Sequence, residues 1–316
     1  MSMFRLDQIL MAAAIAAMIV FAMVSTSEES LNLISLILIW GLFAIGFDLI
    51  FGMAGMLSFG HAAMFGAGGY ALALLAPQFG FLPSLLVAAV AGAALAFLLS
   101  VFALRVSGLF FSLLTLALAQ LVYILASTKL RAFTGGLDGI PGVLRPALFG
   151  VDFYNNRNYF YFLVAVFVIG LAIMALLRVS PFGSALKAVQ ANDVRAEQIG
   201  YNVQRLRQCA FMISGAYAGV SGALLAPTTS IAPFMGQQFV APAFITVVVG
   251  GATNVITGAL GSSLILSLVR TPVGFVFGAF LGLVALLLAA LIIIRLMPDG
   301  ISAWLQRRLD QRHRVA

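Results

Sequence analysis

Two polar residues within an apolar stretch are the first candidates for chemistry. Ser58 and His61 lie three residues apart in the glycine-rich stretch from Ile50 to Leu75, so on a helix they share one face. They could act as a nucleophile and its base, but a hydrolase also needs a group that orients the histidine, and no such set is visible. A polar side chain in apolar surroundings needs water or a polar partner. We therefore expect both to line a polar path, with a histidine bonded to a neighbouring helix as the alternative.

The sequence lacks the residues that ATP hydrolysis, a disulfide framework or a zinc site would require. There is no Gly-Lys pair, hence no phosphate-binding loop of the type GxxxxGK[ST], and ATP hydrolysis must come from another chain. One cysteine, Cys209, and two histidines, His61 and His313, exclude a disulfide framework and a zinc site built from several Cys or His ligands. We expect no enzymatic activity, no metal site and no cofactor in this chain.

Composition defines the class of protein. Hydrophobic residues make up 63% of the 316 residues, charged residues only 9%, and mean hydropathy is +1.12. An ordinary soluble domain has about a quarter of its residues charged, so this is a polytopic membrane protein in contact with lipid. The net charge of +7 does not indicate nucleic acid, because the basic residues are spread over short loops between apolar segments.

Apolar stretches of about twenty residues predict the spans. We expect an all-α protein with about 8 full transmembrane helices plus a broken or re-entrant pair, 8–10 spans in all. The full spans are expected near Ile9–Val24, Leu31–Phe51, Met56–Leu75, Leu82–Leu104, Leu109–Ser127, Tyr159–Leu177, Cys209–Ala226 and Val273–Met297. Among acidic residues and histidines, only Asp48 and His61 lie within these spans. Their small number disfavours a proton-coupled carrier without excluding it.

The stretch from Phe239 to Val269 is interrupted by Gly250, Gly251 and Gly258. Such interruptions predict two half-length helices, whose freed backbone groups must face protein or water. Asn254 and Thr257 lie at this point, and with Ser58 and His61 they complete the residues that we expect along the translocation path. Polar groups that only bond neighbouring helices remain the alternative.

The longest polar interruption runs from Arg178 to Arg207. Pro181 can begin a helix, Ser184 can cap it, and Gly200 can end it. Five small or apolar residues recur at helical spacing opposite the polar ones, which predicts a short amphipathic helix: Ala185, Ala188, Val189, Ala196 and Ile199. Ala196 and Gly200, four residues apart, would leave a shallow surface for a partner protein. A solvated loop is the alternative.

Positive charge predicts the orientation. If the N-terminus, the turn at Arg105, the 178–207 loop and the 298–316 tail are cytoplasmic, 12 of the 17 Lys and Arg residues lie on the cytoplasmic side or at its edge. Both termini are then inside. The loop from 128 to 158 is outside, and its four basic residues, which could meet acidic surface on another protein, are Lys129, Arg131, Arg145 and Arg157. Gly135, Gly136 and Gly139 in this loop are expected to shape turns.

Four blocks of the sequence match a family in order and spacing. They are GMAGMLSFGHAAMFGAGGYALALL from Gly52, RVSGLFFSLLTLALAQLV from Arg105 with FTGGLDGIPG from Phe133, SPFGSALKAVQANDVRAEQIGYNV from Ser180, and VVVGGATNVITGALGSSL from Val247, followed by MPDGI at Met297. The chain resembles the LivM-type permease subunits of branched-chain amino acid ABC importers over nearly its whole length. It departs from the usual family pattern at Asp48, at Val194 and at the run Ala252-Thr253-Asn254.

The resemblance implies a single transmembrane permease domain over residues 1–316 in a bacterial inner membrane. It implies that the helix from Ser184 to Gly200 couples the chain to a cytoplasmic ATPase; the residues expected to carry this contact are Ser184, Lys187, Asn192, Asp193, Arg195, Ala196, Glu197 and Gly200. The implied partners are a homologous permease, two ATPase subunits that bind ATP and Mg, and a periplasmic amino-acid-binding protein. A self-sufficient carrier or channel, and a permease for urea or amides, remain alternatives.

Overall fold

The computed structural model describes residues 28–141, 143, 147–148, 151–234, 236, 240, 288 and 295. The expected spans Ile9–Val24, Phe239–Val269 and Val273–Met297 lie wholly or mostly outside these residues, as does the 298–316 tail. In the described part, six helices are long and apolar enough to cross a membrane: Leu31–Met53, His61–Phe79, Phe81–Ala103, Leu109–Ser127, Asn156–Val179 and Val203–Leu225. They correspond to the six spans expected between residues 31 and 226.

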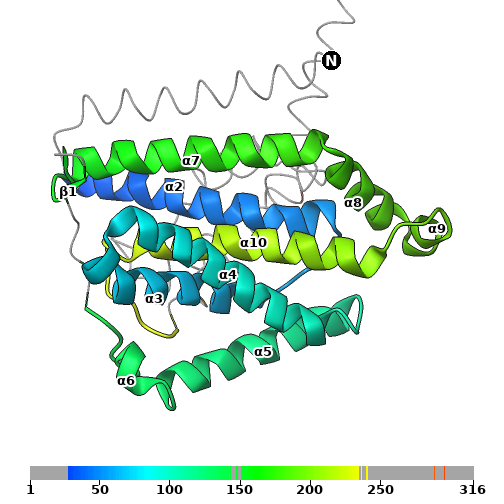
Figure 1. Ribbon diagram of the computed structural model, residues 1–316, viewed down its shortest axis with the longest axis horizontal. Helices are drawn as coiled ribbons and strands as arrows, with labels where there is room; N and C mark the ends of the chain where they lie inside the picture. The colour runs from blue at the N-terminus through cyan, green and yellow to red at the C-terminus, as the bar shows by residue number, and fades with distance from the viewer. Residues whose placement is uncertain are drawn as a thin grey trace, which may run out of the picture.

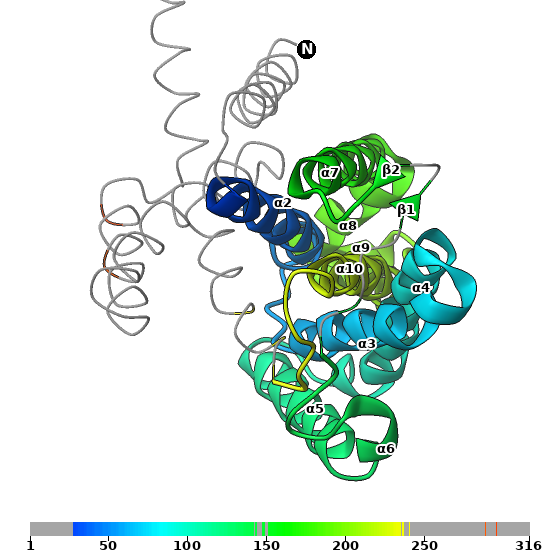
Figure 2. The same cartoon turned by 90° about the vertical axis from the view of Figure 1, so that its left-hand side faces the viewer.

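The six spans are α2 (Glu28–Asp48) with the π-helix η1 (Leu49–Met53), α3 (His61–Phe79), α4 (Phe81–Ala103), α5 (Leu109–Ser127), α7 (Asn156–Val179) and α10 (Val203–Leu225). The helix α10 lies in the middle, packed against α2, α3 and α4, while α7 covers α2 on the outside (Figures 1 and 2). The helix α5 contacts α3 and α4 and leans away from the centre (Figure 1). The long helices that run alongside one another therefore form one bundle around α10.

Glycine allows this close packing at the centre. A Cβ at Gly68 of α3 would lie 1.9 Å from the carbonyl oxygen of Gly219 in α10, and a Cβ at Gly92 of α4 would lie 2.2 Å from that of Gly215. No side chain fits at such distances, so the backbones of α3 and α4 touch the backbone of α10 directly. The glycine-rich span is therefore packed tightly against the central helix.

The same span is also interrupted. Between η1 and α3 the chain from Ala54 to Gly60 is not helical, and Gly55 has a φ of +68°, which favours glycine. The helix expected from Met56 therefore begins at His61.

The two ends of the bundle carry different connections. At one end lie α6 (Arg131–Thr134) and a hairpin of β1 (Ala147–Leu148) and β2 (Val151–Asp152), which is a small exception to the all-helical expectation. At the opposite end lie α8 (Pro181–Ala191) and α9 (Asp193–Gln198) (Figure 1). The loop from residue 128 and the loop from residue 178 therefore lie at opposite ends of the bundle, as the alternation of spans requires.

The loop after α6 is joined to the loop after α10. Ile140 and Ile231 exchange two backbone hydrogen bonds, of 2.8 and 2.9 Å. Gly135, Gly136 and Gly139 all have positive φ, between +68° and +74°, so these glycines do shape turns.

Candidate functional site

The segment expected to be one helix from Ser184 to Gly200 is two helices. Ser180, not Ser184, is the N-cap of α8, because its extended backbone leaves its side chain free to accept a hydrogen bond from the Gly183 N–H, with Pro181 at the first helical position. Asn192 then adopts φ −165° and ψ 109°, which ends α8, and its side chain caps α9 by accepting from the Arg195 N–H at 2.9 Å. The expectations of a Ser184 cap and of a continuous helix are both wrong.

The stop at Gly200 is confirmed. Gly200 has a φ of +95°, its N–H donates to the Glu197 carbonyl, and the Tyr201 N–H donates to the Ala196 carbonyl at 3.1 Å. This pair of bonds is the Schellman arrangement, which satisfies the last carbonyls of a helix. Asn202 then caps α10 by accepting from the Arg205 N–H. Three caps therefore fix the path of a polar segment with little core of its own.

The distribution of apolar side chains on this segment differs from the expectation at two positions. Ala196 is 2% exposed and packs in a small cluster with Val189 and Val203, so it is not part of the surface open to a partner. Ile199 was expected on the same apolar face as Ala196 but is 72% exposed, because the break at Asn192 turns α9 relative to α8. The exposed large apolar side chains of α9 and the residues that follow it are instead Val194, Ile199 and Tyr201.

The polar residues expected to carry the partner contact surround these side chains. Six of them are exposed, and Asp193 is half-buried; the exposed ones are Ser184, Lys187, Asn192, Arg195, Glu197 and Gly200. Asp193 accepts a 2.6 Å hydrogen bond from the Arg207 guanidinium of α10, which joins the end of α9 to the central helix. We call the exposed surface of α8 and α9 the 184–201 face.

The helix α8 is bonded to the end of α2. The Gln190 side-chain amide donates to the Gly52 carbonyl in η1 at 2.8 Å, and Gly55 lies against the same side chain. At the start of η1, Asp48 is 2% exposed, and neither carboxyl oxygen has a hydrogen-bond partner among the described residues. π-helices are rare and frequently occur at functional sites. A displacement of α8 would therefore act directly on a non-standard turn at the end of a span.

Ser58 and His61 do not line an opening. Both are 0% exposed; His61 Nε2 lies 2.6 Å from the Ser214 hydroxyl, and its ring packs edge-on against Phe47 and Phe211. The Ser58 hydroxyl accepts from the Gly60 N–H. In this structure His61 is bonded to a neighbouring helix, which is the alternative stated above, and a polar path at these two residues stays a prediction.

The other expected site residues divide into two groups. Asn254, Thr257 and Arg145 lie outside the described residues. Lys129 and Arg131 are exposed at the end of the bundle that carries α6, and Arg157 is half-buried in the first turn of α7 at that end. The structure therefore places three of the four basic residues at one end but says nothing of the broken segment. Among the described residues, no group of three or more His, Cys, Asp or Glu could hold a metal ion.

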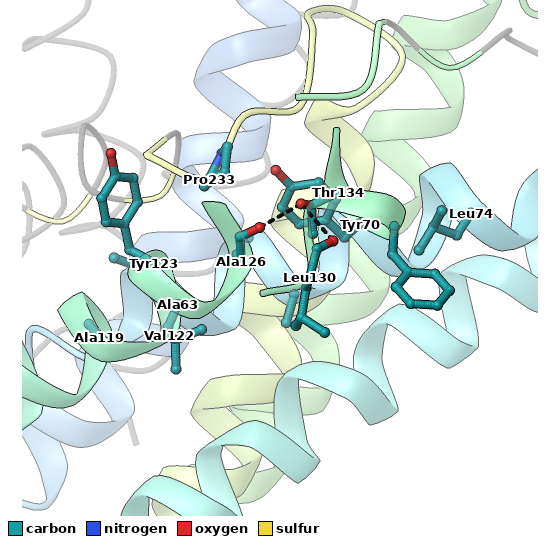
Figure 3. A pocket seen from close by; sticks show the side chains of 14 residues that line it. Ala63, Tyr70, Leu74, Ala119, Val122, Tyr123, Ala126, Leu130, Thr134 and Pro233 are labelled. Carbon is teal, nitrogen blue, oxygen red and sulfur yellow. Dashed lines mark hydrogen bonds between the residues drawn. The ribbon is translucent and has the colours of Figure 1, made fainter. Parts of the chain in front are cut away.

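A cavity of about 330 Å³ lies between α3 and α5 (Figure 3). Its walls are Gly66 and Tyr70 of α3 and Ala119 and Tyr123 of α5, and its end is covered by Thr134 and Pro233. The lining is almost wholly apolar. This cavity was not among the expectations from the sequence, although the small residues Ala62, Gly66 and Ala67 ahead of Tyr70 are the pattern that leaves room beside a helix.

Residues 29–296 match the family described as branched-chain amino acid transport system / permease component. The chain belongs to this family. The match includes all six spans, α8 and α9, so the segments around the cavity and the 184–201 face are parts of the family's shared region.

Three individual relatives share between 25% and 29% of their residues with this chain over the aligned regions. The chain is 27% identical over 261 residues to the high-affinity branched-chain amino acid transport system permease protein LivM of Escherichia coli K12, covering 75% of this chain and 60% of LivM. It is 25% identical over 296 residues to LivH of the same strain, covering 87% and 94%. It is 29% identical over 156 residues to the guanosine ABC transporter permease protein NupQ of Bacillus subtilis, covering 48% and 46%. The chain thus spans about three fifths of LivM, and the relatives' solutes differ.

Proposed function

We propose that this chain is the membrane-spanning permease subunit of an ATP-driven importer for branched-chain or related neutral amino acids. The observation that carries the proposal is the match to the permease family over residues 29–296, with six spans inside it. The guanosine permease among the relatives makes a different neutral solute, urea and amides included, the alternative for the substrate.

The proposed partners follow from a chain that carries no phosphate-binding loop. Two cytoplasmic ATPase subunits bind ATP and Mg, and one of them seats on the 184–201 face. A homologous permease completes the membrane part, and a periplasmic amino-acid-binding protein delivers the solute. This places the chain in a bacterial inner membrane with both termini in the cytoplasm, the orientation that the distribution of Lys and Arg favours.

The contacts of α8 support a mechanical role. When the ATPases close on ATP, they move the 184–201 face, and this movement reaches the spans at two points. One is the hydrogen bond from Gln190 to Gly52 in η1, and the other is the ion pair between Asp193 and Arg207 of α10. Because α10 packs against α2, α3 and α4, a shift of α10 is transmitted to the whole bundle.

At the other end, the exposed charges of Lys129 and Arg131 offer positive charge to the delivering protein. Arg157 stands at the same end, and Arg145 belongs to the same loop by sequence. Contacts between exposed charges are screened by salt, so delivery of the solute should slow as ionic strength rises.

Affinity purification and reconstitution test the proposal together. We expect the chain, tagged and extracted from its native membrane, to co-purify with a second permease and with ATPase subunits that hydrolyse ATP. Proteoliposomes that contain this chain alone should take up no leucine, and those that contain the complete assembly, its binding protein and ATP should take it up. Uptake by the chain alone would instead establish a self-sufficient carrier or channel.

A further inference from the structure

The cavity between α3 and α5 has a shape that packing alone does not explain. Gly66 lies in its wall, and no heavy atom of the described residues lies within 4 Å of where a Cβ at this position would stand. Two residues away, a Cβ at Gly68 would collide with the backbone of α10 at 1.9 Å. Glycine destabilises the interior of a helix relative to alanine, and at Gly66 no close approach of another helix in the described chain compensates for it.

One turn further along α3, Tyr70 brings an unpaired polar group to the same cavity. Its side chain is 91% buried, being 9% exposed, and its hydroxyl has no hydrogen-bond partner among the described residues. A buried hydroxyl without a partner is costly, and buried polar groups in proteins are nearly always bonded. The neighbouring Thr134 hydroxyl is not bonded to Tyr70: it shares its one hydrogen between the Ala126 and Leu130 carbonyls (Figure 3) and accepts from the Gly136 N–H.

The facing wall leaves room for a small molecule. The α5 side of the cavity is formed by Ala119, Ala126 and Tyr123, and the Tyr123 hydroxyl points away from Thr134 (Figure 3). A volume of about 330 Å³ lies at the lower end of the range of about 300–1,000 Å³ that is typical of small-molecule sites. An aliphatic group fits the apolar lining, and an oxygen acceptor fits the free Tyr70 hydroxyl.

We propose that the cavity between α3 and α5 is a binding site for the transported solute, with its aliphatic part against Gly66 and an oxygen acceptor on the Tyr70 hydroxyl. This inference rests on the proposed import function and adds where in the chain the solute is recognised. A lipid tail is the less favoured occupant, because a hydrocarbon chain has no acceptor for the hydroxyl and because α6 and Pro233 cover one end of the cavity.

Two variants test the two halves of the site in the complete transporter, reconstituted with its binding protein and ATP. Gly66→Leu fills the open space, so uptake of radiolabelled leucine should fall at least about tenfold relative to that of alanine, which needs less room. Tyr70→Phe removes only the hydroxyl and should lower uptake of both amino acids about two- to tenfold, since both carry the same carboxylate. Tyr161→Phe, which removes a hydroxyl from α7 outside the cavity, is the matched control and should leave uptake unchanged.

The outcomes separate this site from the proposed function. A falling leucine-to-alanine ratio in Gly66→Leu supports the site, since a purely structural fault would lower both rates together. If the wild-type transporter takes up leucine but the ratio stays constant and Tyr70→Phe matches Tyr161→Phe, the site is overturned while the import function stands. If Gly66→Leu fails to assemble, Tyr70→Phe decides alone. A wild-type transporter that moves neither amino acid overturns both proposals, and a co-purifying lipid displaced by Gly66→Leu at constant ratio assigns the cavity to lipid.

Discussion

At the scale of single residues, His61 is a structural group held by a chain of hydrogen bonds. The Ser214 hydroxyl donates its only hydrogen to the Gly46 carbonyl at 2.5 Å, so at its 2.6 Å contact with His61 it accepts from Nε2–H. This chain links α3, α10 and α2 in surroundings that exclude water, where each bond is worth more than it would be at a surface.

We expect Ser214→Ala to lower the free energy of unfolding by about 1–3 kcal/mol, because it leaves the His61 N–H buried without a partner. Ser221→Ala is the control on the same helix. Its hydroxyl is equally buried but donates only to the Tyr217 carbonyl one turn back in α10, so its loss should cost less than about 1 kcal/mol. Thermal unfolding in detergent compares the two, and equal midpoints would contradict the structural role of the chain.

The sequence indicated that Ser58 and His61 are unusual residues for an apolar span, but it did not indicate which groups they contact. A serine and a histidine in an apolar span must have polar partners, and this much follows from their types alone. The partner of His61 is 153 residues away, and its position depends on how α3 packs against α10, which periodicity does not reveal. The contact between His61 and Ser214 could not be predicted from the sequence for this reason.

At the scale of elements, glycines decide how closely the helices approach. A Cβ placed at Gly222 of α10 would lie 1.9 Å from the Phe65 carbonyl oxygen of α3, so the two backbones touch there. Gly219 of α10 and Gly68 of α3 are in contact in the same way. Several glycines in one span favour direct backbone contact, so the composition of the span agrees with this close packing. It could not distinguish Gly68, which needs its small size for packing, from Gly66, which faces open space.

We therefore predict opposite effects on stability for two alanine substitutions in α3. Gly68→Ala should lower the free energy of unfolding by about 1–3 kcal/mol or more, because its methyl group forces α3 away from α10. Gly66→Ala should leave it unchanged or raise it by up to about 1 kcal/mol, because alanine favours the helix and meets no neighbour. Chemical unfolding of the purified protein measures both. A destabilised Gly66→Ala would mean that the cavity wall is packed after all.

The connecting segment shows a different limit of sequence-based prediction. Residue types correctly placed a helix start at Pro181 and a stop at Gly200, since proline and glycine have strong positional preferences. Nothing in the apolar spacing marked the break at Asn192, because asparagine occurs both within helices and at their caps. That single break moves Ile199 from the buried face to the surface and leaves Ala196 inside.

At the scale of the whole molecule, α10 connects the two ends. It begins beside α9, where Arg207 is paired with Asp193, and ends beside the loop in which Ile231 is joined to Ile140. One rigid central helix thus spans from the face proposed to meet the ATPase to the loops that cover the cavity between α3 and α5. A movement at one end can therefore alter the other end without a separate relay.

The 184–201 face provides the sharpest test at this scale, because it presents apolar side chains where a free surface should be polar. Ile199 is 72% exposed at the end of α9, and burial of this side chain by a partner would stabilise the complex. Ile199→Glu places a charge in that contact and should reduce the ATPase subunit recovered with the tagged chain at least about tenfold. Fold and insertion should be unaffected, since the side chain lies on the surface.

Val106→Glu is the matched control. Val106 is 39% exposed in the turn between α4 and α5, at the same end of the bundle but outside the 184–201 face. It receives the same charge in a similar setting and should retain the ATPase. Quantitative co-purification, with the amount of inserted permease held equal, compares the two variants. Undiminished recovery of the ATPase with Ile199→Glu would remove α9 from the contact and would leave the exposed apolar side chains of this face without a partner.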